Sequence, residues 1–153
     1  MRHPSLALWF AAGCFYKPAS YEIDSQPFPG TRVELACLDV AVALTDDAKA
    51  PPPVVSYTFG NRCTHATVVD LASVRVITKL ADGSRVDMHP YDPKHELAAL
   101  PIDGWWRGHE EIAYAPAGPP PIQVCAEVGH IEPDAAAPDR WVCMSATELA
   151  GAP

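Results

Sequence analysis

Imidazole, carboxylate and aromatic side chains are densest between His89 and Glu111, where metal or acid–base chemistry would have to be sought. The site-like residues there are His89, Tyr91, Asp92, His95, Glu96, Asp103, Trp105, Trp106, His109, Glu110 and Glu111. Histidines and carboxylates bind zinc or copper when three or four converge. Their spacing fits no ligand motif, and the members of a pair such as His95-Glu96 point opposite ways in an extended chain. We therefore predict a solvated acidic loop and no metal ligand, with metal binding as an alternative.

A nucleophile motif is missing from the sequence. There is no Gly-x-Ser-x-Gly, and Ser84 follows Gly83 in a predicted hairpin turn, where a structural role is expected. No P-loop or dinucleotide-binding glycine pattern occurs. The sequence thus predicts no catalytic residue and no cofactor, so we expect a protein that is not an enzyme.

The cysteines predict disulfide chemistry. Apart from Cys14, the residues Cys37, Cys63, Cys125 and Cys143 make an even set, as expected for two disulfides in an oxidising compartment. None is spaced Cys-x-x-Cys, which argues against structural zinc. We favour Cys37–Cys63 with Cys125–Cys143, because each pair flanks a candidate hairpin turn on neighbouring strands. Cys63–Cys125 is the rival pairing, by analogy with antibody-like domains.

The pair Trp105-Trp106 is a candidate recognition surface. Successive side chains of a strand face opposite sides, so one ring is expected in the core and the other in solvent. An exposed Trp is a common anchor at binding surfaces. The alternative is that both rings pack in the core or over an edge of the fold.

Alternation of apolar residues with a period of two predicts the strands that would position these groups. The expected strands are residues 32–44, 55–59, 66–80 with a bend near Ala72-Ser73, 85–88, 110–115, 122–131 and 140–144. Asp82-Gly83 is the clearest hairpin turn, and residues 92–100 form one helical turn at most. Seventeen prolines disfavour helices. We predict one all-β domain over residues 31–146, an immunoglobulin-like antiparallel sandwich of about seven strands.

The N-terminus carries a pattern of export. Ala11-Ala12-Gly13-Cys14 follows the apolar residues 6–10 and the basic Arg2. This pattern resembles the lipobox of bacterial lipoproteins, in which small residues precede a cysteine that is lipidated and becomes the new N-terminus. The resemblance implies a signal peptide over residues 1–13, lipidation of Cys14 and a tether over residues 14–30. It places the protein at the cell envelope, in the outer membrane or facing the periplasm, or makes it secreted if Cys14 carries no lipid.

Charge and hydropathy restrict the partners. The net charge of −8 argues against nucleic acid, since phosphate binding needs basic patches. No later apolar stretch is long enough to span a bilayer, so we expect membrane contact through the N-terminal lipid. Residues 147–153 have the character of a frayed tail.

Strand and turn motifs occur in a recognisable order along the chain. They are Val55-Ser-Tyr-Thr-Phe-Gly-Asn61, Thr67-Val-Val-Asp-Leu71, Asp82-Gly83, Leu100-Pro-Ile-Asp-Gly104 and Glu110-Glu-Ile-Ala-Tyr114. The order is similar to that of small exported bacterial immunoglobulin-like domains, among them the BsuPI-type proteinase inhibitor, and covers about half of the chain. A shared fold supports an activity only by analogy.

Together these patterns favour a lipid-anchored, non-catalytic module for interaction with an envelope protein or for structural support. Peptidase inhibition through the loop at Pro116 to Pro121 is the first alternative, and metal binding is the second.

Overall fold

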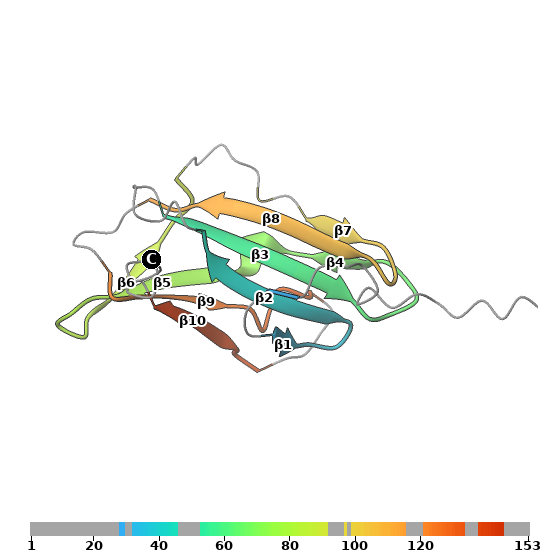
Figure 1. Ribbon diagram of the computed structural model, residues 1–153, viewed down its shortest axis with the longest axis horizontal. Coiled ribbons are helices and arrows are strands. Elements are labelled where there is room, and N and C mark those ends of the chain that lie inside the picture. Colours follow the sequence, from blue (N-terminus) through green and yellow to red (C-terminus); the bar gives the residue numbers. More distant parts are fainter. Residues whose placement is uncertain are drawn as a thin grey trace, which may run out of the picture.

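The computed structural model describes residues 28–29, 32–45, 53–91, 97, 99–115, 121–133 and 138–145. Within these ranges the chain forms two four-stranded sheets and one two-stranded sheet, all with antiparallel pairing. The sheet that contains β3 and β8 lies over the sheet that contains β5 and β9 (Figure 1). The predicted all-β sandwich is therefore confirmed.

The order of the strands is immunoglobulin-like. The first sheet runs β1 (Arg32–Glu34), β2 (Leu38–Leu44), β3 (Val54–Asn61), β8 (Arg107–Ala113). The second sheet runs β10 (Trp141–Ser145), β9 (Gln123–Glu127), β5 (Arg75–Lys79), β6 (Arg85–Met88). The small sheet pairs β4 (Thr67–Val69) with β7 (Leu100–Ile102). Because β3 pairs with β8 and β5 with β9, the chain crosses between layers as in an immunoglobulin sandwich.

The core lies between the two large sheets and is filled from alternate positions of their strands. On β3, Tyr57 and Phe59 are fully buried, with ring centroids 6.4 Å apart. The Tyr57 hydroxyl shares a 2.9 Å hydrogen bond with the hydroxyl of Tyr114, so these polar atoms are paired inside the apolar core. Other buried side chains are Leu38, Val40, Val42, Val55, Val76, Ile112, Val124, Ala126 and Val142. These buried positions follow the period of two from which the strands were predicted.

Both disulfides have the favoured connectivity. Cys37 and Cys63 are bonded across the open end of the β2–β3 hairpin, with their Cα atoms 5.3 Å apart. Cys125 and Cys143 are bonded between directly opposite positions of β9 and β10. The rival pairing of Cys63 with Cys125 is excluded.

Two of the expected long strands are each divided, which raises the number of strands above the expected seven. Residues 32–44 turn after β1, where the Leu35 amide donates to the carbonyl of Leu38. Residues 66–80 are divided at the predicted bend by the 3-10 helix η3 (Leu71–Ser73). Asp70 caps η3 by accepting a 3.0 Å hydrogen bond from the Ala72 amide. Asp70 therefore has a structural role.

The predicted turn at Asp82-Gly83 joins β5 to β6. Gly83 has a φ of 85°, a conformation that glycine adopts without steric cost. Asp82 Oδ1 accepts hydrogen bonds from both the amide and the hydroxyl of Ser84. Ser84 is consequently a turn residue, as predicted.

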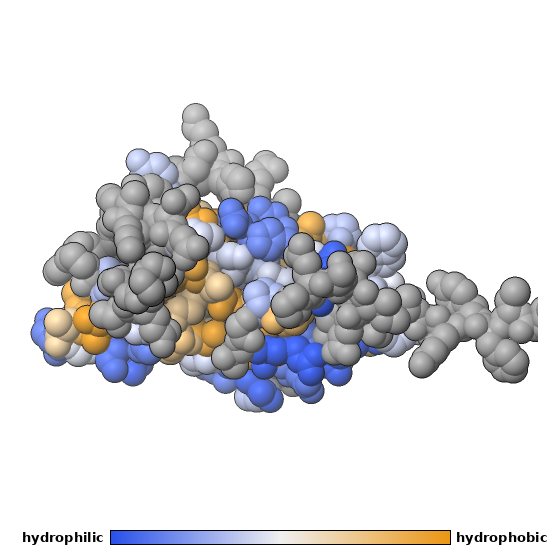
Figure 2. Space-filling view, in the orientation of Figure 1, coloured by the Kyte–Doolittle hydropathy of each residue, from blue (hydrophilic) through white to orange (hydrophobic). Residues whose placement is uncertain are grey.

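Hydrophilic residues cover only part of the sandwich surface seen in Figure 2, which also shows apolar areas. In Figure 2 the hydrophilic residues gather over the lower edge, where Figure 1 places β1, and over β8. Arg32 and Glu34 of β1 and His109 and Glu111 of β8 are exposed.

Several predictions about the chain ends and loops fall on residues outside the described ranges. They are the signal peptide over residues 1–13, the lipidated Cys14, all of the tether except Phe28 and Pro29, most of the helical turn expected over residues 92–100, and residues 146–153. Leu100, the last residue of that expected turn, begins strand β7 instead. Within the described part of the chain, no helix is long and apolar enough to span a membrane.

Candidate functional site

The outer face of the second sheet presents an aromatic ring among charged groups. Antiparallel register places Ile77 beside Cys125 and Cys125 beside Cys143. The neighbouring row brings Glu127 between Arg75 and Trp141. Since side chains alternate along a strand, these residues share the face opposite to the core.

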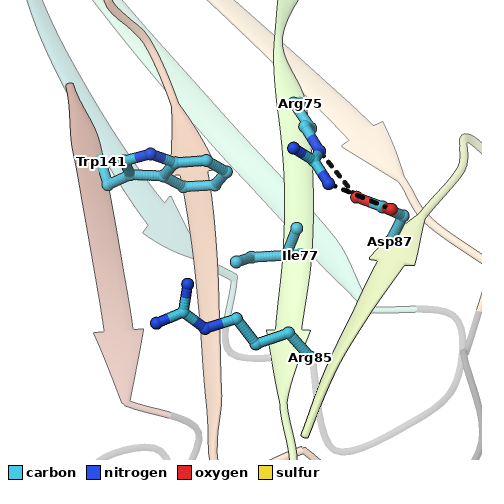
Figure 3. A pocket seen from close by; sticks show the side chains of 5 residues that line it. All are labelled: Arg75, Ile77, Arg85, Asp87 and Trp141. Atoms are coloured by element: carbon cyan, nitrogen blue, oxygen red, sulfur yellow. Dashed lines mark hydrogen bonds and ion pairs between the residues drawn. The ribbon is translucent and has the colours of Figure 1, made fainter. Parts of the chain in front are cut away.

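A pocket of about 100 Å³ lies on this outer face, lined by Arg75, Ile77, Arg85, Asp87 and Trp141. Ile77 points outward from β5 yet is only 8% exposed. In Figure 3 the Trp141 ring extends from β10 toward Ile77, and the Arg85 side chain reaches toward the same place from β6. Trp141 itself remains 40% exposed. The pocket therefore has an apolar floor, one aromatic wall and charged groups on its other sides.

Arg75 and Asp87 form the charged pair of this pocket. The Arg75 guanidinium donates from Nε at 2.8 Å and from an Nη nitrogen at 3.2 Å to the two Asp87 oxygens. Hydrogen bonding to Arg75 lowers the pKa of Asp87, and the same pair raises the pKa of Arg75. Both side chains are at least half exposed, at 65% and 50%. The pair holds a fixed geometry while keeping further donors and acceptors open to solvent.

Glu127 anchors the loop that follows β9 at the end of the same face. Its side chain is 7% exposed, and Oε1 accepts from the amides of Gly129 at 2.6 Å and Arg140 at 2.8 Å. Oε2 accepts from Nδ1 of His130 at 2.9 Å. Burial raises the pKa of Glu127, but these hydrogen bonds outweigh it and the net pKa is lowered. Hydrogen bonding to Glu127 raises the pKa of His130.

This carboxylate–imidazole pair resembles part of an acid–base site, but its surroundings favour a structural role. A carboxylate that accepts a hydrogen bond from Nδ1 of a histidine leaves Nε2 free to take a proton from a nucleophile. The hydroxyl bonded at this loop, that of Ser73, donates instead to the carbonyl oxygens of Asp70 and His130. A Cβ on Gly129 would collide with the carbonyl of Pro138, so the loop requires glycine here.

The same cluster is the nearest arrangement to a metal site. Ligand atoms of Glu127, His130 and Asp139 lie within 4.8 Å of one another. Both Glu127 oxygens are already used by protein donors, so only His130 and Asp139 offer open positions. One weak signal of this cluster is present in the sequence, a glutamate in the otherwise apolar run 124–128.

Trp105 and Trp106 lie in the turn between β7 and β8, not on a strand. The Trp106 amide donates to the carbonyl of Asp103 at 3.1 Å and closes that turn. Trp106 is 65% exposed, and Trp105 is half-buried with a φ of 65°. Alternation along a strand therefore does not apply to them, and neither ring is fully buried. A positive φ at a bulky residue is unusual and costs about 1–2 kcal/mol.

Buried Asn61 holds this turn against the neighbouring loop. Its side-chain amide donates to the carbonyl of His65 at 2.8 Å and to that of Ile102 at 2.9 Å. Its backbone amide donates to the carbonyl of Trp106 at 3.0 Å. At Gly104 a Cβ would collide with the carbonyl of Thr64, so the two loops are in close backbone contact. The tryptophan turn is thus fixed from several sides.

The residues between His89 and Glu111 are not brought together as a metal site in the described part of the chain. His109 Nε2 lies 3.5 Å from Glu111 Oε1 on exposed β8. Asp92, His95 and Glu96 are outside the described residues. The other close group of three, Cys37, Cys63 and His65, includes the two bonded sulfurs of a disulfide.

The chain was compared with protein-family models, with curated proteins and with solved structures, and none of the three comparisons found a match.

Proposed function

We propose that this protein is a lipid-anchored, non-catalytic immunoglobulin-like module of the cell envelope that binds a partner protein through Trp105 and Trp106. The observation that carries the proposal is Trp106, 65% exposed in a turn that Asn61 fixes to its neighbouring loop. Exposed tryptophans are enriched among the residues that dominate binding energy at protein interfaces. A turn that is already rigid loses little conformational entropy on binding.

The cellular location rests on two features of the chain. The two disulfides indicate an exported protein, because such bonds persist in oxidising compartments. The lipobox-like segment before Cys14 supports anchoring by lipid, with residues 14–30 as the tether to the sandwich. Attachment at the N-terminus would leave the sandwich free to present its loops to a neighbouring envelope protein.

Peptidase inhibition remains the alternative implied by the resemblance to BsuPI-type domains. The loop considered for it lies outside the described residues, apart from Pro121. The fixed tryptophan turn is a second place where a peptidase could be contacted, because inhibitory loops must also be rigid and exposed. We therefore treat inhibition as one form of the proposed protein interaction.

Site-specific photo-crosslinking in a Gram-negative host tests the proposed surface. A photoreactive phenylalanine at position 106 should give a discrete crosslinked protein, and Trp105→Ala should reduce its yield at least fivefold. The same probe at Tyr91, an equally accessible aromatic at 60% exposure, is the matched control and should not give that product. No product from position 106, or the same product from position 91, would overturn the proposed surface.

A further inference from the structure

The pocket on the outer face of the second sheet supports a ligand site separate from the tryptophan turn. Three strands supply its walls: Trp141 comes from β10, Arg75 and Ile77 from β5, and Arg85 and Asp87 from β6 (Figure 3). These side chains surround a cavity of about 100 Å³ that is open to solvent.

Trp141 gives this pocket a flat apolar wall. Its ring extends across the sheet toward Ile77 and stays 40% exposed (Figure 3). The disulfide at Cys143, two residues further along β10, ties this strand to β9. The ring therefore stands on a strand that is crosslinked to its neighbour. A flat aromatic face of this kind packs well against the C–H groups of a sugar ring.

The charged side chains that line this pocket, two arginines and one aspartate, favour an acidic ligand. Glu127 lies on the same face, but both of its carboxylate oxygens are hydrogen-bonded to the loop after β9. Arg85 forms no ion pair with any residue in the described ranges, and register places the cation Lys79 directly opposite it. The carboxylate of Asp87 is already paired with Arg75. The pocket is thus locally cationic in a chain whose net charge is −8. A guanidinium matches the planar geometry of a carboxylate and can bind both of its oxygens.

The Arg75–Asp87 pair distinguishes a sugar from an acidic peptide. Arg75 uses two of its N–H groups on Asp87 and keeps others for a ligand. Asp87 adds acceptor oxygens next to those donors. A sugar hydroxyl both donates and accepts hydrogen bonds, so it is matched by such a pair, whereas a second carboxylate placed at the pair, as in a run of acidic side chains, would be repelled by Asp87.

We propose that this pocket binds a sugar ring bearing a carboxylate, as found in the uronate residues of acidic polysaccharides. The ring packs on Trp141, the carboxylate pairs with Arg85, and hydroxyls bond to Arg75 and Asp87. No bond is made or broken, so this is a binding site. It does not depend on the protein partner proposed for Trp105 and Trp106.

Isothermal titration of the purified, disulfide-bonded protein tests this site with three probes: oligomers of galacturonate, of mannuronate and of the glucuronate-containing polymer hyaluronan. At least one should bind saturably. Trp141→Ala and Arg85→Gln should each weaken its binding at least tenfold, and so should methyl esterification of the carboxylates, which keeps the ring and removes the charge. Trp106→Ala is the matched control and should bind as the unmodified protein does, because its exposed tryptophan is not part of the pocket.

Three results would overturn the proposal: no binding by any probe, binding unaffected by Arg85→Gln, or equal binding of polyglutamate. The last result would make the face a general anion surface. Arg85 is exposed, so its variant should fold even if Trp141→Ala does not, and the methyl ester comparison needs no variant. Since the photo-crosslinking at position 106 reports on the other surface, failure of one proposal is distinguishable from failure of the other.

Discussion

The side-chain amide of Asn61 donates a 2.9 Å hydrogen bond to the carbonyl oxygen of Ile102, which lies 41 residues further along the chain. Asn61 ends β3 and Ile102 ends β7, so this bond joins a main strand of the sandwich to the strand that precedes the tryptophan turn. Asn61 is fully buried, and its Oδ1 also accepts from the Cys63 amide at 2.8 Å. One side chain therefore holds both loops at this end of the fold.

Replacement of Asn61 by Ala should destabilise the fold and loosen the tryptophan turn. It leaves the carbonyls of His65 and Ile102 without their donor, at a cost of about 1–3 kcal/mol for each buried group left unpaired. Urea unfolding should show the loss of stability, and hydrogen exchange at the Trp106 amide should accelerate. Asn61→Asp keeps the acceptor for Cys63 but loses both donors, so unchanged stability in that variant would contradict the role given to the amide.

Removal of either disulfide should lower stability by a similar amount. The bonded cysteines are separated by 26 and 18 residues, and loops of such size correspond to about 3 kcal/mol in the chain-entropy model. The double variants Cys37→Ala/Cys63→Ala and Cys125→Ala/Cys143→Ala should each shift the urea midpoint downward. If either double variant were as stable as the unmodified protein, the disulfide that it lacks would contribute nothing to the stability of the fold.

Arg62→Met should destabilise the protein because it removes one of the two cationic partners of the buried carboxylate of Asp39. Asp39 is fully buried, with Arg62 Nε 3.0 Å away and Arg32 3.5 Å away. Burial raises the pKa of Asp39, and the charge of Arg62 opposes that rise. Breaking one partner of a buried pair costs about 3–5 kcal/mol, and the low end is expected because Arg32 remains.

The pH dependence of this variant gives a control. Without Arg62 the pKa of Asp39 should rise further, so the folded state binds a proton more readily than the unfolded state does. Stability is then lost as pH rises from the unfolded pKa of Asp39 through its folded pKa. The deficit of Arg62→Met should therefore be larger at pH 7 than at pH 4, and an equal deficit at both would mean that the effect is not electrostatic.

His130 should titrate above the ordinary histidine range because Glu127 favours its charged form. Its stabilising contribution is complete below the unfolded pKa and is lost as pH rises through the raised folded pKa. Glu127→Gln should lower the pKa of His130 toward its ordinary value of 6.5. Nuclear magnetic resonance titration of the imidazole measures this directly, and a pKa that stays raised in the variant would assign the shift to other groups.

Local patterns predicted most of the strands and the disulfide pairing, but not β7, which was not among the expected strands. Each prediction follows from side chains a few residues apart, as in the alternation of Tyr57 and Phe59 or the cysteines that flank a hairpin. The division of residues 66–80 was foreseen only as a bend. β4 belongs to a separate sheet because it pairs with β7, which is distant in sequence.

The candidate sites were harder to predict because they depend on register between distant strands. Trp141 lies two residues before Cys143 of the second disulfide, but nothing in the sequence brings it near Arg85, 56 residues earlier on β6. Trp105 and Trp106 were singled out for their residue type. They lie in a turn that is closed by the hydrogen bond from the Trp106 amide to Asp103 and held by the contacts of Asn61. A hydrophobic period of two does not predict these contacts.

Intact mass spectrometry of the protein, expressed with its own N-terminus in a Gram-negative host, tests most directly that this is a lipid-anchored, disulfide-stabilised envelope module. From this interpretation we expect a species that begins at Cys14, carries added acyl mass, and gains four hydrogens when its two disulfides are reduced. An unacylated chain that begins at Met1 and whose mass is unchanged by reductant would contradict it.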